Sequence, residues 1–287
     1  MFEIHAENLG FPEGPVALPD GSVAFVDLLH RKVRRWHDGK VEVIADIPGS
    51  PNGMRLGPDG ALYIANNGGL APKGLHELDR AEPLISGRIQ RLTLDGKLSD
   101  HITGLDGNGP WRPNDLVFTP EGSILFTDPQ NWEDIRTWEN ADDIPGYHGG
   151  RLYLGRSDGT ARVLAPYYGF PNGLVFHPDG SLIVAVTLHK RLVKFSWDGE
   201  NLGSPTTWLN FDNGTAPDGI LYHEGLFYIA GSVSDKLTIV DDKGRFVRSI
   251  DLDEGSDPTN LCIQNGRLFV TLGLMGKLVS FDLSALA

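Results

Sequence analysis

Short apolar runs, separated by turns rich in proline, glycine and aspartate, repeat along almost the whole chain, and helical periodicity is nearly absent. In the first repeat, the apolar runs are residues 16–18, 23–26, 32–36 and 41–44, with Asp20-Gly21 and Asp38-Gly39 as turns between them. Asp-Gly between alternating apolar runs is a strong signal for a β-hairpin. Each repeat is therefore predicted to be a small up-and-down sheet of four strands.

A proline-led turn opens each of six such repeats and places one polar residue just before the first strand. The six turns are Pro12-Glu13-Gly14-Pro15, Pro51-Asn52-Gly53-Met54, Pro113-Asn114-Asp115-Leu116, Pro171-Asn172-Gly173-Leu174, Pro217-Asp218-Gly219-Ile220 and Pro258-Thr259-Asn260-Leu261. Repeats of roughly 40 residues that each hold several strands are typical of a propeller. We therefore predict an all-β, six-bladed β-propeller that forms one domain over residues 1–287.

The order of the strands predicts how the ring closes and where its loops lie. The sixth repeat ends after its third strand, residues 277–281, so residues 2–5 are expected to add the missing fourth strand and remove an exposed edge. Two long insertions, residues 67–86 and 129–149, follow second strands. In an up-and-down blade they lie on the same face as the proline-led turns. We expect them to form pocket walls, with mere elaboration of the packing as the alternative.

The repeat brings the polar residue of each turn to an equivalent place around one axis. The predicted ring is Glu13, Asn52, Asn114, Asn172, Asp218 and Thr259. Carboxylate and amide oxygens are the ligands that Ca²⁺ prefers, and Mg²⁺ and Mn²⁺ accept similar sets. The alternative is that Asn and Asp after proline only form turns. Six copies in register, with carboxylates in only two, favour a central divalent-metal site.

Charge and composition limit which binding partners and which cellular location are expected. The formal net charge of −13, with no basic stripe to offset it, argues against nucleic acid and anionic membranes as partners. The single cysteine, Cys262, lies in an apolar run and is expected to be buried and inert. The amino terminus has neither a basic start nor an apolar run, and no segment approaches the ~20 apolar residues of a membrane span. A cytoplasmic protein of unknown oligomeric state is expected.

Four motifs resemble those of the gluconolactonase, regucalcin (senescence marker protein) and luciferin-regenerating enzyme family. They are Phe11-Pro12-Glu13-Gly14-Pro15, Arg112-Pro113-Asn114-Asp115, Pro171-Asn172-Gly173-Leu174 and Ala216-Pro217-Asp218-Gly219. The resemblance implies a six-bladed propeller with one divalent metal in its channel, and lactone or phosphotriester hydrolysis as its activity. By motif match it places metal ligands at Glu13, Asn172 and Asp218, and substrate contacts at Arg112 and Asn114. The stretch Thr187-Leu188-His189 departs from the family pattern and bears on sugar specificity.

Together these inferences predict a metal-dependent hydrolase of a lactone, either a sugar lactone or a related cyclic ester. One divalent cation, Ca²⁺ first and Zn²⁺, Mn²⁺, Mg²⁺ or Fe²⁺ as alternatives, would polarise the ester carbonyl and activate water. Asp218 is the expected catalytic base, with the cation itself as the other source of activated water. Arg112, Asn114 and His148 are expected to bind the substrate, and Asn114 is also a candidate fourth metal ligand.

Three alternatives stay open at this point. The same geometry suits a phosphotriesterase, and a calcium-binding regulatory propeller without turnover would carry the same ring. For Arg112, the alternative to substrate binding is a salt bridge to Asp115 or Asp106.

Overall fold

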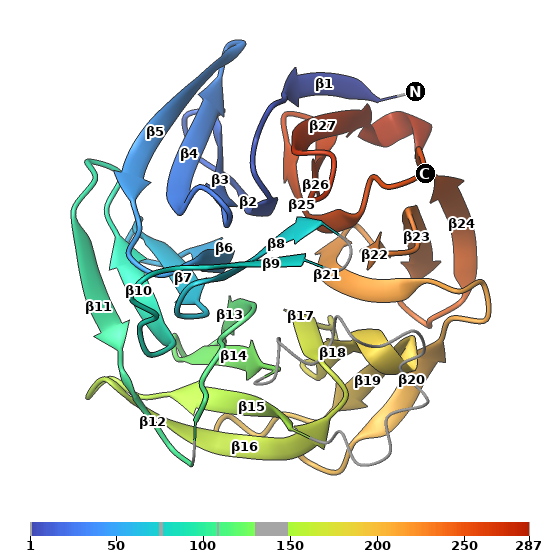
Figure 1. The fold of residues 1–287 in the computed structure, drawn as a ribbon. Coiled ribbons are helices and arrows are strands. Elements are labelled where there is room, and N and C mark those ends of the chain that lie inside the picture. The colour runs from blue at the N-terminus through green and yellow to red at the C-terminus, as the bar shows by residue number, and fades with distance from the viewer. Residues whose placement is uncertain (1, 75–76, 108, 130–148, 287) are drawn as a thin grey trace.

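In the computed structural model, which describes residues 2–74, 77–107, 109–129 and 149–286, six sheets stand around one axis like the blades of a propeller (Figure 1). The blades follow one another around the ring in chain order. This confirms the predicted all-β, six-bladed propeller. None of the helices formed by the described residues has the length and apolar character that crossing a membrane requires.

Each blade is an antiparallel sheet whose first strand lies nearest the axis, and blade three has an added parallel strand. Blade one consists of β2 (Pro12–Ala17), β3 (Val23–Asp27), β4 (Lys32–His37) and β5 (Lys40–Asp46). Blade two consists of β6 (Pro51–Leu56), β7 (Leu62–Asn66), β10 (Arg88–Leu92) and β11 (Leu98–Ile102). Blade three consists of β13 (Leu116–Phe118), β14 (Ile124–Asp128), β15 (Gly150–Gly155), β16 (Thr160–Tyr168) and the added β12 (Gly104–Leu105).

The other half of the ring repeats this plan. Blade four consists of β17 (Pro171–Phe176), β18 (Leu182–Val186), β19 (Arg191–Phe195) and β20 (Thr206–Asn210). Blade five consists of β21 (Ala216–His223), β22 (Leu226–Ser232), β23 (Lys236–Asp241) and β24 (Phe246–Asp251). Blade six consists of β25 (Pro258–Gln264), β26 (Arg267–Leu272), β27 (Lys277–Asp282) and β1 (Glu3–Ala6). Two short 3-10 turns, η3 (Thr187–His189) and η4 (Leu283–Ala285), complete the described elements.

The core lies between the blades and is richest along the second strands. Every residue of β3, β7, β14 and β18 is buried, because neighbouring blades cover both faces of these strands. The fourth strands form the rim and leave apolar side chains exposed, such as Val43 in β5 and Phe246 in β24. Cys262, in β25, is buried as predicted, and burial raises the pKa of its thiol to about 12.

The amino-terminal strand closes the ring, as the incomplete sixth repeat predicts. Glu3 pairs with Ser280 and Ala6 with Leu278, so β1 forms the outer strand of blade six. The Glu3 carboxylate also accepts an ion pair from Arg267 at 2.9 Å. The first and last strands of the chain therefore lie side by side in one sheet.

Deleting residues 1–6 is expected to lower the melting temperature by roughly 5–10 °C. The deletion exposes the edge of β27 and removes the pairing with β1, a loss of a few kcal/mol in a chain whose melting temperature shifts by about 2–4 °C per kcal/mol. Thermal unfolding followed by circular dichroism measures the change, with Glu3→Gln as a control that keeps the strand. An unchanged melting curve for the deletion would show that β1 contributes nothing to closure.

The proline-led motifs lie inside the first strands of five blades, so the prediction that they precede those strands is wrong there. In blade one, Pro12 pairs with Asp27 and Glu13 with Val26, and the register then shifts before Val16. The cause is a β-bulge, which locally interrupts a ladder and redirects side chains. Only in blade three does the first strand start after the polar residue of the motif, at Leu116.

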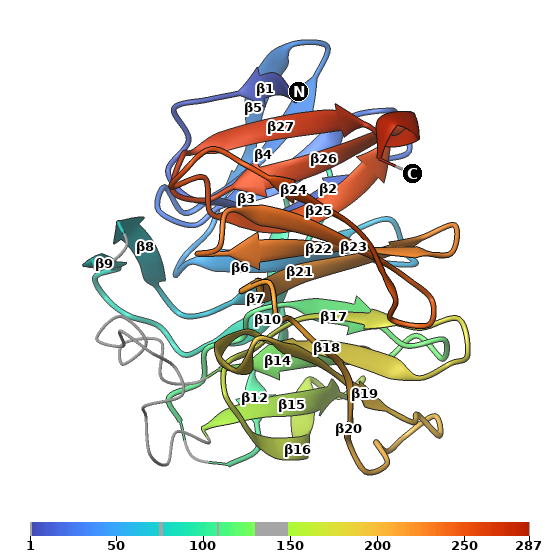
Figure 2. The ribbon, with the colours of Figure 1, turned by 90° about the vertical axis from the view of Figure 1, so that its right-hand side faces the viewer.

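The first long insertion forms a hairpin of β8 (Leu70–Gly74) and β9 (Glu77–Arg80) that extends across the centre of the ring (Figure 1) and projects from one end of it (Figure 2). An ion pair between Arg31 and Asp79 links the hairpin to blade one. Gly68, at the base of the hairpin, lies beside the Arg112 guanidinium, so this insertion overhangs the predicted face. Residues 130–148 of the second insertion, including His148, lie outside the described residues.

Candidate active site

The six ring residues are all buried around the axis, at the inner end of their blades. They are Glu13, Asn52, Asn114, Asn172, Asp218 and Thr259. Hydrogen bonds between neighbouring blades run through the same turns. Gly53 donates its backbone N–H to the Asn114 carbonyl at 2.6 Å, and the Thr259 hydroxyl donates to the Pro12 carbonyl at 3.0 Å. The backbone that carries the ring is therefore fixed from blade to blade.

Glycine after the ring residue permits this close approach. A Cβ on Gly53 would lie 2.4 Å from the Asp115 carboxylate, and a Cβ on Gly219 would lie 2.4 Å from the Asn260 side chain. Four blades have glycine at this position, whereas blades three and six have Asp115 and Asn260. Gly53 and Gly219 thus make room for the side chains of the next blade, whereas Gly14 and Gly173 make room for its backbone.

The two ring carboxylates lie in an environment that opposes their ionisation. Burial, then the Glu13 and Asp257 carboxylates, raise the pKa of Asp218 well above its ordinary value, and a hydrogen bond with Asn172 offsets only part of this. Burial and the Asp115 carboxylate raise the pKa of Glu13 to about 8. A bound cation would reverse both shifts, because an opposite charge nearby favours the ionised form.

The donor set fits a hard divalent cation. Among the described residues, no three His, Cys, Asp or Glu side chains come together in a way that could hold a metal. A cation would therefore have to take amide oxygens beside Glu13 and Asp218. Asn172 lies beside this pair, since its amide nitrogen donates to the Thr187 hydroxyl at 3.3 Å and its side chain forms a hydrogen bond with Asp218. Oxygen donors of this kind suit Ca²⁺ and disfavour a structural zinc site.

Asn52, on the blade-two side of the ring, offers a further polar group. Its buried amide nitrogen has no hydrogen-bond partner among the described residues. A buried donor without an acceptor is costly, which indicates that this side of the ring faces a polar ligand or water.

Arg112 and Asn114 lie on the blade-three side of the ring, next to the first insertion. The Arg112 backbone N–H donates to the Asp128 carboxylate at 3.0 Å, and its guanidinium donates to the Trp111 carbonyl at 3.0 Å. Asp115, considered from the sequence as a partner for Arg112, instead forms an ion pair with Arg55 at 2.9 Å. Arg112 is buried, and its guanidinium lies beside Gly68 at the base of the β8–β9 hairpin.

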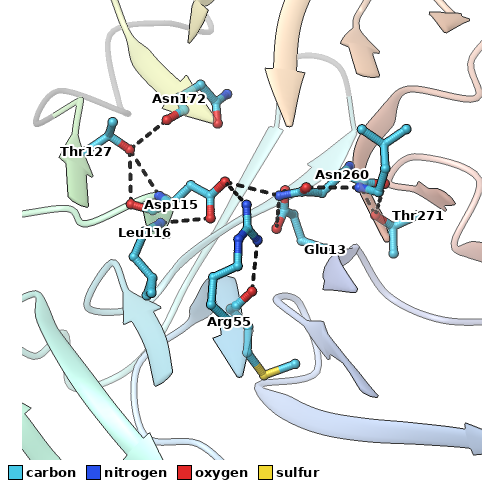
Figure 3. A network of polar contacts seen from close by, with 10 residues as sticks. Glu13, Arg55, Asp115, Leu116, Thr127, Asn172, Asn260 and Thr271 are labelled. Carbon is cyan, nitrogen blue, oxygen red and sulfur yellow. Dashed lines mark hydrogen bonds and ion pairs between the residues drawn. The ribbon is translucent and has the colours of Figure 1, made fainter. Parts of the chain in front are cut away.

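Sequence reasoning missed three contributors to this site. Thr187 orients Asn172 and also donates to the Pro217 carbonyl at 2.7 Å, so the unusual blade-four stretch supports the ring. Asn260 contacts Glu13, and Arg55 pairs with Asp115 (Figure 3). Aligning the repeats could have singled out Asn260, because it replaces a glycine. Arg55 gives no such signal, since its long side chain reaches the axis from four residues beyond the proline.

Comparison with known proteins places this arrangement in a family. The family model described as the SMP-30/Gluconolactonase/LRE-like region matches residues 11–273. The chain belongs to this family. The match includes all six proline-led turns, so the family resemblance inferred from four motifs is confirmed over nearly the whole chain.

Two curated relatives show how far the sequence similarity extends. The gluconolactonase of Zymomonas mobilis is 26% identical over 245 residues, which cover 76% of this chain and 63% of that protein. The human adipocyte plasma membrane-associated protein is 29% identical over 192 residues, which cover 60% of this chain and 42% of that protein. The chain therefore spans less than two thirds of the length of either relative.

Solved structures share the fold. A gluconolactonase from Xanthomonas campestris has a TM-score of 0.74 at 22% identity, covering 96% of this chain and 87% of that one. Regucalcin from Agrobacterium tumefaciens, a calcium-binding protein, has a TM-score of 0.74 at 18% identity, covering 98% of this chain and 93% of that one. At these identities the similarity shows the propeller fold alone.

In the absence of a divalent cation, the protein is expected to lose thermal stability between about pH 5 and pH 8. The folded pKa of Glu13, about 8, lies above its ordinary value of 4.5, so the folded protein retains a proton that the unfolded chain releases. Stability therefore falls as pH rises through this interval. Melting temperatures measured with a chelator across the interval, and again with Ca²⁺, test the sign; a rise with pH in chelator would contradict it.

Proposed function

We propose that this protein is a cation-dependent hydrolase of a lactone, either a sugar lactone or a related cyclic ester. The observation that carries the proposal is the pair of buried carboxylates, Glu13 and Asp218: burial and the Glu13 carboxylate raise the pKa of Asp218, and the Asn172 amide forms a hydrogen bond with Asp218. Two carboxylates in one buried site need a cation to be stable in their ionised forms. Membership of a family that includes gluconolactonases supports a lactone as the substrate.

Glu13, Asn172 and Asp218 would hold the cation, with Asn114 as a further oxygen ligand and Ca²⁺ as the first choice. When bound, the cation supplies Lewis-acid polarisation of the ester carbonyl. Asp218 has two carboxylate oxygens, so one can face the cation while the other accepts a proton from the attacking water. Its buried, acidic surroundings raise the pKa of Asp218 and so favour this proton transfer. A bound cation would lower the same pKa.

Arg112 would donate to the ester carbonyl oxygen and to the negative charge that develops on it, because a guanidinium has donors and no acceptor. Asn114, two residues further along the chain, would orient a ring or hydroxyl oxygen of the substrate. His148, outside the described residues, remains a proposed substrate contact. A cytoplasmic location, and the absence of nucleic-acid and membrane partners, also remain predictions from the sequence.

The residues directly before the six prolines support a substrate with both polar and apolar parts. They are Phe11, Ser50, Arg112, Phe170, Ala216 and Asp257. Phe11 and Phe170 come from opposite blades, yet both belong to one apolar cluster that includes Leu70 and Ala71 of the β8–β9 hairpin. An apolar cover above an acidic ring suits a lactone whose carbonyl end is polar and whose ring presents an apolar face.

The proposal is tested with cation-free protein to which Ca²⁺, Mg²⁺, Mn²⁺, Zn²⁺ or Fe²⁺ is restored one at a time. Each form is assayed with a sugar lactone, simple γ- and δ-lactones and a fluorophosphate. We expect lactone hydrolysis to vanish with chelation and to return with at least one cation. Lactone hydrolysis that survives chelation would contradict the cation dependence. Turnover of the fluorophosphate alone would indicate a phosphotriesterase, and cation binding without any turnover would indicate a regulatory propeller.

A further inference from the structure

Two side chains from opposite blades meet at the axis, one residue beyond the ring. Asp115 of blade three and Asn260 of blade six occupy the position that is glycine in the other four blades. The Asn260 amide nitrogen lies 3.4 Å from the Asp115 carboxylate (Figure 3).

The orientation of both side chains is fixed by their own backbone. Asp115 accepts the Leu116 N–H at 2.8 Å, and Asn260 accepts the Leu261 N–H at 2.9 Å with its amide oxygen. The Asn260 amide nitrogen is therefore the group that faces the axis. The Asn260 backbone N–H is held in turn by the Thr271 hydroxyl at 3.2 Å.

Asn260 also contacts a ring carboxylate directly. Its amide nitrogen lies 3.1 Å from one oxygen of Glu13 and 3.4 Å from the other. One amide thus donates to Glu13 and to Asp115, two buried groups that would otherwise repel each other. Hydrogen bonds from outer residues orient the ligands of a metal and raise its affinity.

Arg55 balances the charge on the other side of this contact. Its guanidinium forms the 2.9 Å ion pair with Asp115 and donates to the Met54 carbonyl at 2.9 Å. Both carboxylate groups that face Asn260 are buried, and Arg55 forms its ion pair with the Asp115 carboxylate. Arg55 therefore neutralises the charge of Asp115, which would otherwise strengthen the electrostatic attraction between the ring and a cation.

We propose that Asn260 is a positioning residue that holds the Glu13 carboxylate for a cation, and that the Arg55–Asp115 pair limits how strongly the ring binds that cation. We call Arg55, Asp115 and Asn260 the axial network. The proposal rests on the proposed cation site and deepens it. The proposal gives Asn260 and the Arg55–Asp115 pair opposite effects on cation affinity. A network with a merely structural role would not have opposite effects.

Cation affinity of the variants distinguishes these effects. Ca²⁺ is titrated into chelator-treated protein, with calorimetry giving the Kd and thermal unfolding giving the stability of the cation-free form. Asn260→Ala is expected to weaken binding by roughly 10–100-fold, the usual effect of removing a partner of a metal ligand. Asn260→Ser, which keeps a donor at this position, should recover part of the loss and serves if the alanine variant does not fold.

Gln264→Ala is the matched control for Asn260. Gln264 lies on the same strand, β25, and its amide donates to the Leu18 and Ser22 carbonyls of blade one at 2.7 and 3.0 Å. Its loss removes partly buried amide hydrogen bonds between the same two blades. We expect a lower melting temperature and an unchanged Kd. Equal weakening in both variants would overturn the positioning role.

Arg55→Met is expected to act in the opposite direction. It leaves Asp115 without its cationic partner, so the cation-free protein should be less stable while Ca²⁺ binds roughly tenfold more tightly or better. Adding Asp115→Asn to Arg55→Met removes the uncompensated charge and should return the Kd close to that of the wild type. Weaker binding in Arg55→Met would overturn the charge-balancing role.

The wild-type titration separates this inference from the proposed function. If none of the tested divalent cations binds the wild-type protein, the cation-dependent function fails and the axial network loses its proposed role with it. If the wild-type protein binds Ca²⁺ and all the network variants bind it equally well, the function stands and only the inference fails.

Discussion

Replacing Asp218 with alanine is expected to abolish lactone hydrolysis and to remove most cation binding, while leaving a folded β-rich propeller. Asp218 is buried and is one of only two ring carboxylates, so its loss halves the anionic charge that the ring offers to a cation. A metal-bound carbonyl gains several kcal/mol of transition-state stabilisation, and losing it slows turnover by roughly a thousandfold or more. Kinetics on a lactone substrate and Ca²⁺ calorimetry measure the two losses.

The stability of the cation-free variant provides a further check, because it should not fall although activity and cation binding are lost. Asp218 is repelled by Glu13 and Asp257 and is buried, which raises its pKa and destabilises its ionised form. Without a cation, Asp218→Ala should therefore be at least as stable as the wild-type protein. Adding Ca²⁺ should stabilise only the wild type. Activity and Ca²⁺ binding equal to those of the wild type would show that Asp218 is not a ligand.

Asp27→Ala is the matched control for Asp218→Ala. Asp27 is also a buried aspartate, at the end of β3, but it forms an ion pair with Arg34 at 2.9 Å and accepts backbone N–H groups from Gly10 and Phe11. Its loss should lower the melting temperature, since it leaves donors without their acceptor. The Kd for Ca²⁺ should not change, so that the effect of Asp218 cannot be attributed to a loosened fold.

The repeat of proline-led turns was enough to predict the propeller, the ring of polar residues and the closure by β1. Each follows from the period of the repeats and from the alternation of apolar runs and turns within them. Both can be read directly along the sequence. The start of the first strands was misplaced, because the bulge that includes Glu13 in the ladder depends on how two strands pair. A bulge keeps the alternation of apolar residues on either side and so leaves no clear mark in the pattern.

The residues around the ring were harder to predict, because they come from distant parts of the sequence. Arg55 reaches Asp115 across 60 positions, and Asn260 reaches Glu13 across 247. The sequence does mark Asn260, which breaks a glycine pattern that the close approach of blades requires elsewhere. Thr187 was noted only as a departure from the family pattern, whereas in the structure its hydroxyl orients a ring amide.

Replacing Arg112 with alanine is expected to separate substrate chemistry from cation binding. Arg112 cannot be a metal ligand, because a guanidinium is always cationic and has no acceptor. Its guanidinium lies beside Gly68, at the base of the β8–β9 hairpin. That hairpin crosses the axis (Figure 1). Arg112→Ala should leave the Ca²⁺ Kd unchanged and lower kcat/KM by about 2–3 kcal/mol of transition-state stabilisation, the scale for one donor to an oxyanion.

The division of this loss between kcat and KM decides the role of Arg112. A fall in kcat means that the guanidinium acts mainly on the transition state, whereas a rise in KM alone means that it binds ground and transition states alike. Arg112→Lys keeps the positive charge but not the planar guanidinium that can donate two parallel hydrogen bonds. A partial recovery of kcat/KM would indicate that the charge is what matters, and no recovery would indicate a bidentate contact with the substrate. Arg91→Ala, which removes an exposed ion pair with Asp59 in blade two, is the control and should not change the kinetics. If Arg112→Ala matches that control, its hydrogen bond to Trp111 is structural, and the oxyanion role passes to the cation alone.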